Sequence, residues 1–100
     1  MAWRRLIKEV RPNMETPFFA ASDEDILHIH EKYESTGKCS VVDISYSSDG
    51  LIKSKTRIFD SESSRDEYMA DPVIQELSKS HQAHCLLYNT VKSKVEDKEI

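Results

Sequence analysis

Residues Cys39–Phe59 read CSVVDISYSSDGLIKSKTRIF, which is two alternating segments joined by a turn. Apolar side chains recur at every second position before the turn, and Ile52 and Ile58 share one parity after it. Alternation on both sides of the Asp49-Gly50 pair is typical of a β-hairpin. We therefore expect two antiparallel strands here, with Ile52 and Ile58 facing the core.

A helical pattern lies on each side of this hairpin. Ser22 is a favourable N-cap, three acidic residues follow it, and apolar residues recur at helical spacing up to Tyr33. The second pattern begins with either Ser61 or Ser63 as its cap and contains Asp71-Pro72, a pair typical of a helix restart. These residues predict one helix before the hairpin and two helical pieces after it.

The two ends of the chain read as further strands. Trp3–Val10 predicts the first strand, the alternation from Cys85 to Val95 predicts the last, and 96–100 is expected to be a frayed tail. The order β-α-β-β-α-β within one domain, residues 1–100, predicts an α+β fold of the ferredoxin-like type. In this fold a four-stranded antiparallel sheet carries the helices on one face, and the first and third strands are central.

Cysteine and histidine residues are few. Cys39 and Cys85 should begin strands at opposite edges of the sheet, which is too far apart for a disulfide. His81, His84 and Cys85 are metal-ligand types, but the expected end of the helix would scatter their directions, and no further ligand is evident. We interpret them as a polar helix end and expect no metal and no cofactor.

Composition excludes several classes of function. The net charge of −4 disfavours a nucleic-acid partner, and two glycines cannot supply a phosphate-binding loop. No apolar run reaches the roughly 20 residues of a membrane span, so we expect no membrane association. The first ten residues lack the apolar region of a signal peptide, so we expect a cytoplasmic protein of a cell or a virus.

A cationic stripe lies on the second strand of the hairpin. Lys53, Lys55 and Arg57 have the parity opposite to that of Ile52 and Ile58. If the two isoleucines face the helices, the three cations lie on the uncovered face of the sheet. They are either a solvated face or candidates for contact with an anionic ligand or with acids of a partner.

The outer strands are expected to add apolar side chains to that open face. On the first strand, Trp3 with Ile7 and Leu6 with Val10 have opposite parity, and the sequence leaves open which pair faces outward. Tyr88, on the expected last strand, faces outward. A half-apolar surface favours burial against a second copy, so we expect a homodimer. The candidate ligand or interface residues are Trp3, Lys53, Lys55, Arg57 and Tyr88.

Residues 58–74, IFDSESSRDEYMADPVI, resemble the third strand and second helix of the dimeric α+β barrel group, which includes antibiotic biosynthesis monooxygenase-like proteins. The matching features are an aromatic at the strand end (Phe59), Ser61, a helical aromatic (Tyr68) and a kink at Asp71. The resemblance implies the ferredoxin-like fold and a small-molecule pocket. The cationic stripe departs from the apolar pocket of the cofactor-free oxygenases in that group, and no catalytic residue is carried over.

Two classes of function follow. The preferred one is a non-catalytic homodimeric interaction or assembly subunit that uses the open sheet face, because no acid–base pair converges in the sequence. The alternative is a small-molecule-binding protein, with a cofactor-free monooxygenase-like enzyme as its catalytic form. Its pocket would be lined from the first strand, the third strand and the loop 13–19.

Overall fold

The computed structural model describes residues 1–100 and contains a four-stranded antiparallel sheet and three helices, the α+β class predicted. The strand order is β2-β3-β1-β4, so β1 and β3 are central, as expected. In chain order the elements are β1 (Trp3–Val10), α1 (Asp23–Ile29), the π-helical turn η1 (His30–Glu34), β2 (Cys39–Tyr46), β3 (Ile52–Phe59), α2 (Glu62–Ala70), α3 (Pro72–Tyr88) and β4 (Val91–Glu99).

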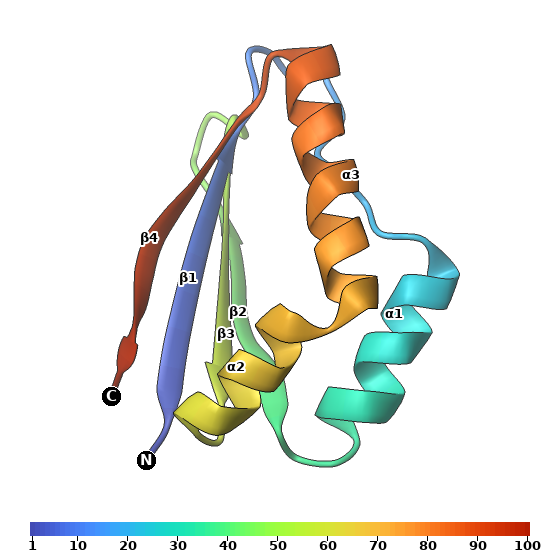
Figure 1. Ribbon diagram of the computed structural model, residues 1–100. Helices are drawn as coiled ribbons and strands as arrows, with labels where there is room; N and C mark the ends of the chain where they lie inside the picture. The colour runs from blue at the N-terminus through green and yellow to red at the C-terminus, as the bar shows by residue number, and fades with distance from the viewer.

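The helices α1, α2 and α3 all lie on one side of the sheet, and α3 runs along its length (Figure 1). The other face of the sheet carries no helix, and the two termini lie close together at one end (Figure 1). None of the helices combines the length and the apolarity that crossing a bilayer requires. The side of the sheet that each strand residue faces therefore decides whether it meets the helices or the surroundings.

The predicted turn and caps are present. Gly50 has a φ of +74°, which a glycine adopts without strain and which the turn between β2 and β3 requires. The side chains of Ser22 and Ser61 accept hydrogen bonds from the backbone of the first turns of α1 and α2. Asp71 separates α2 from α3 and caps α3, with Pro72 at its first position. The break predicted at this pair is confirmed.

The prediction for the last strand was wrong in its position. The helix α3 continues through Tyr88 and ends at Asn89, which has a φ of +55°. Leu86 and Leu87 are 84% and 74% exposed, so they belong to a solvent-exposed final turn of α3 and not to the start of a strand. β4 begins at Val91 and extends through the supposed tail, because residues up to Glu99 pair with β1.

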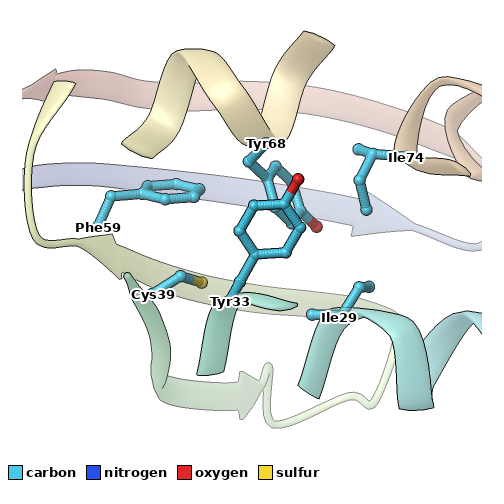
Figure 2. Close-up of a cluster of buried hydrophobic side chains, with 6 residues drawn as sticks. All are labelled: Ile29, Tyr33, Cys39, Phe59, Tyr68 and Ile74. Atoms are coloured by element: carbon cyan, nitrogen blue, oxygen red, sulfur yellow. The ribbon is translucent and has the colours of Figure 1, made fainter. Parts of the chain in front are cut away.

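A small aromatic core joins the helices to one end of the sheet. Tyr33 and Phe59 have no exposed surface, and Tyr68 stands edge-on to both, with ring centroids 5.1 and 5.3 Å away. Figure 2 shows these rings with Cys39 at the start of β2 and Ile74 in α3. Edge-to-face aromatic pairs add to the free energy gained from burying the rings. This cluster fixes α2 against the ends of β2 and β3.

One buried carboxylate, that of Asp71, connects α1, η1 and α3. Asp71 Oδ2 accepts hydrogen bonds from Tyr33 Oη and His28 Nε2, both 2.7 Å away, and from Lys32 Nζ at 3.3 Å. Its Oδ1 accepts from the Val73 N–H at 2.9 Å. Burial alone would raise the pKa of Asp71, but these hydrogen bonds outweigh it and hold the pKa well below its ordinary value. Ionised Asp71 therefore stabilises the fold.

Replacing Asp71 with asparagine tests this network. We expect Asp71→Asn to lower the free energy of unfolding by about 2–3 kcal/mol near pH 5, since a buried charge-assisted network is lost. The folded-state pKa is lowered, so the stabilisation exists above the unfolded pKa of about 4 and is lost as pH falls toward the folded value. Urea denaturation of both proteins should show the difference shrinking below about pH 4.

The exposed helix cap Ser22 provides the matched control for this prediction. Ser22→Ala should cost about 1 kcal/mol, and the cost should not change over the same acid range. An equal cost of Asp71→Asn at both ends of that range would contradict the proposed role of the charge.

Candidate functional site

A cavity of about 340 Å³ lies between the sheet and the helices, beyond the aromatic core. Its lining includes residues of β1 and β3 and Phe19 of the loop, together with residues of the helices, of β2 and of β4. Part of its wall is apolar. The aliphatic side chains in this wall are Ile7, Ile26, Ile29, Val41, Ile74 and Leu77.

The cationic stripe of β3 lines this cavity, so its predicted position on the open face was wrong. Phe59 is buried against the helices, and side chains two apart on a strand share a face. Arg57, Lys55 and Lys53 therefore point to the helix side, where all three line the cavity. Ile58 pairs with Arg4 and takes the opposite face.

The register between β1 and β3 also determines which apolar pair of β1 faces outward. Trp3 pairs with Phe59 and packs against the core, so Trp3, Arg5, Ile7 and Glu9 face the helices. Leu6 and Val10 are consequently the pair on the uncovered face. A register shift between Val41 and Asp43 in β2 breaks the alternation of that strand.

Five cationic side chains and two carboxylates line the cavity. Arg5 from β1 and Lys92 from β4 join the three cations of β3. One of the carboxylates, Glu9, already accepts hydrogen bonds from His81 Nε2 at 2.9 Å and from the Phe19 N–H at 3.2 Å. The cavity therefore carries a net positive charge. The cation set, called here the cationic wall, is Arg5, Lys53, Lys55, Arg57 and Lys92.

The lysines of the cationic wall have no partner of opposite charge. No ion pair within 4 Å involves Lys53, Lys55 or Lys92, whereas Arg5 Nε lies 4.0 Å from Asp97 Oδ2 and has no hydrogen-bond partner. Burial lowers the pKa of Lys55, and the charges of Arg57 and Lys53 lower it further. Burial likewise lowers the pKa of Lys92, aided by Arg5. The wall is thus an assembly of like charges that oppose one another.

Arg57 is held in place by neutral neighbours. Its Nη1 donates a hydrogen bond to Cys39 Sγ at 3.2 Å, and its guanidinium lies 5.2 Å from the centroid of the Tyr68 ring. Burial raises the pKa of the Cys39 thiol, because it outweighs the opposing effect of Arg57. A buried, protonated thiol is not a nucleophile, so Cys39 acts here as a packing residue.

Two of the residues predicted for the site lie elsewhere. The Trp3 indole N–H donates to Asp97 Oδ1, and Arg65 lies over the indole at 5.0 Å, outside the cavity. Tyr88 is on α3, with its ring 4.6 Å from that of His84, and not on β4. Lys53, Lys55 and Arg57 are the predicted residues that the fold brings together.

Sequence reasoning missed Arg5, Glu9 and Lys92. Arg5 and Glu9 have the same parity as Trp3 and Ile7 on the first strand. Treating Trp3 as a core residue would therefore have placed Arg5 and Glu9 on the helix side. Lys92 shares the parity of Tyr88 in the expected strand and would lie on the open face, whereas β4 of the structure directs it toward the helices.

The continuation of α3 also changes the cluster of potential metal ligands. His81 and Cys85 lie four residues apart in one helix, and Glu9 of β1 supplies a third ligand type within 4.8 Å of both. The sequence offered no third ligand, because Glu9 is more than seventy residues away along the chain.

Comparison with known proteins adds no relative. No family model, curated protein or solved structure matches the chain.

Proposed function

We propose that the protein binds a small anionic molecule with an apolar part in the cavity between the sheet and the helices. The observation that carries this proposal is the cationic wall. Its lysines are partly buried, lack ion pairs and adjoin other cations. Buried unpaired charges cost free energy, and they cluster at functional sites.

The chemistry of the lining suggests the class of ligand. A planar guanidinium at Arg57 and ammonium groups at Lys53 and Lys55 match a carboxylate, which they bind through charge-assisted hydrogen bonds. Opposite them, the apolar wall includes Ile74 and Leu77. An amphipathic organic carboxylate satisfies both surfaces, and 340 Å³ is within the usual size of a small-molecule pocket.

Benzoate is a suitable probe because it carries one carboxylate on an apolar ring. We expect calorimetry to detect its binding and Lys55→Met to weaken it at least about tenfold, which corresponds to about 1.4 kcal/mol. The matched control is Lys8→Met, because Lys8 is a lysine of β1 that pairs with Ser54 on the uncovered face. The affinity of the Lys8→Met protein for benzoate should differ from that of the unsubstituted protein by less than about twofold.

Uncharged benzamide separates the two parts of the proposed site. Its binding should be weaker than that of benzoate and equal in the Lys55→Met and Lys8→Met proteins. Equal benzoate affinity of the two variants, or no benzoate binding by the unsubstituted protein, would refute the anion site.

The like charges of the cationic wall should lower the stability of the ligand-free protein, which gives a second prediction about Lys55. Without ligand, Lys55→Met should make the protein more stable at neutral pH, since it removes a desolvated charge beside two others. The folded-state pKa of this lysine is lowered, so the unfolded chain binds more protons and the stability of the unsubstituted protein rises with pH.

The measurement is chemical denaturation at increasing pH. The stability gained by Lys55→Met should shrink as the pH rises toward the ordinary lysine pKa of about 10.4, because Lys55 of the unsubstituted protein loses its proton below that value. A loss of stability in Lys55→Met would mean that this lysine serves the fold and not a ligand.

We further propose that the chain is of the ferredoxin-like type and pairs with a second copy through the uncovered sheet face. The element order, the strand order and the one-sided placement of the helices support this assignment (Figure 1). The dimeric α+β barrel resemblance at 58–74 points in the same direction, whether or not the protein is an enzyme. The two free thiols fit a reducing compartment such as the cytoplasm.

The composition of the uncovered face favours this second candidate function, an interaction or assembly subunit. Leu6, Val10, Ile52 and Ile58 lie on the outward parity of the two central strands. Charges of both signs flank them, including the Arg4–Glu96 ion pair at 2.7 Å. A surface with an apolar centre and mixed charges at its margin is suited to an isologous contact with its own copy.

Native mass spectrometry tests the dimer. We expect twice the 11.6 kDa chain mass for the unsubstituted protein and the single-chain mass for Leu6→Lys, because a buried lysine would be unpaired in the interface. The control is Leu86→Lys on the exposed end of α3, which should remain dimeric. Dissociation by Leu86→Lys alone would place the contact on α3 instead.

A further inference from the structure

We propose that Glu9, His81 and Cys85 form a binding site for a zinc-type divalent metal ion at the edge of the cavity. The nearest ligand atoms of the three side chains all lie within 4.8 Å of one another. Glu9 is buried and the other two residues are partly buried. One oxygen, one imidazole nitrogen and one sulfur are the ligand types that zinc binds.

Two different elements bring the three ligands together. His81 and Cys85 are four residues apart in α3, and this spacing places them on one face of the helix. Glu9 comes from β1, on the side of the sheet that faces α3, as the cavity lining shows. Tetrahedral zinc ligands lie closer together than 4.8 Å, so metal binding requires only a small inward shift.

Outer contacts already orient two of the ligands. The Phe19 N–H donates to Glu9 Oε2 at 3.2 Å, which leaves Oε1 directed at His81 Nε2, 2.9 Å away. The Phe19 ring stacks on the His81 ring, with centroids 4.5 Å apart and planes inclined by 16°. Such outer-shell contacts fix the ligand atoms of metal sites. His84 lies outside this cluster of ligand atoms, and its Nε2 is hydrogen-bonded to the Pro17 carbonyl at 2.9 Å.

The proton balance of binding is simple. The metal takes the place of the thiol proton of Cys85, which passes to solvent, and the single ring proton of neutral His81 moves to the nitrogen that does not bind the metal. Three protein ligands leave the fourth position of a tetrahedral ion for water or another donor. Because Glu9 and His81 line the cavity, that position is adjacent to the cationic wall.

Lys92 is the residue that opposes the ion. It pairs with Glu9 across β1 and β4, and its charge acts on His81. The site is therefore expected to bind less tightly than its ligand set alone would allow. Removing this charge should strengthen metal binding, which a merely structural histidine–glutamate pair does not predict.

Cobalt and zinc titrations of the purified metal-free protein test the site. Co²⁺ should produce a thiolate-to-metal absorption band in the near ultraviolet, and zinc should abolish it by displacement. Cys85→Ser should eliminate the band, and Glu9→Gln or His81→Gln should weaken zinc binding at least about 100-fold in calorimetry, more than loss of an outer-shell contact. Lys92→Met should strengthen it about tenfold.

Two control variants, Cys39→Ser and His84→Gln, should leave the cobalt band and the zinc affinity unchanged. Circular dichroism shows which variants are folded. If His81→Gln does not fold, the zinc affinity of the isosteric Glu9→Gln variant decides whether the metal site exists. A cobalt spectrum without a thiolate band, or zinc binding unaffected by Glu9→Gln, overturns the site. The readouts need no benzoate, and Lys8→Met on the uncovered face should not alter them, so failure of the metal site is distinguishable from failure of the proposed anion site.

Discussion

The complete burial of Phe59 at the end of β3 is the constraint on which the arrangement of this protein depends. A strand directs alternate side chains to opposite faces, so the orientation of one buried ring determines that of Arg57, Lys55 and Lys53. The pairing of Phe59 with Trp3 and Cys39 carries the same choice to β1 and the start of β2. One aromatic anchor thereby places a row of cations between the sheet and the helices.

The protein separates stability from binding along the length of the sheet. At one end, Tyr33, Phe59 and Tyr68 pack edge to face, and the Asp71 carboxylate ties α1 and η1 to the start of α3. Beyond this end the space between sheet and helices is not filled by side chains, and charged groups line it. A protein selected for stability alone would place apolar residues there, because they fill space without a desolvation cost.

Two kinds of chemistry meet in this space. The cationic wall offers charge to an anion, whereas Glu9, His81 and Cys85 offer electron-pair donors to a metal ion. Lys92 belongs to the cationic wall and is the β4 neighbour of Glu9, so its charge favours the anion and opposes the metal ion. The uncovered face of the sheet, with Leu6 and Ile58, is separated from both by the sheet itself, so the proposed pairing with a second copy and the proposed ligand binding do not compete for surface.

The sequence by itself determined the elements and their order. Local sequence was sufficient to predict the turn at Gly50, the cap at Ser22 and the break at Asp71, because each depends on residues that are close together in the chain. It left Ser61 and Ser63 open as the cap of α2, and the structure has Ser61. Local chemistry failed at the end of α3, since the alternation near Leu86 and Leu87 is compatible with either a strand or an exposed helical turn.

Only the tertiary structure decided which face each strand residue takes and which distant residues meet. On β3 the pairs Ile52/Ile58 and Arg57/Phe59 are both consistent with a core-facing parity, and the packing of Phe59 against Tyr68 made the choice. Glu9 and His81 come together because the side chains of β1 and α3 face each other at the cavity, an arrangement that no local pattern encodes. The candidate sites depend on such long-range contacts, so they became visible only once the chain was folded.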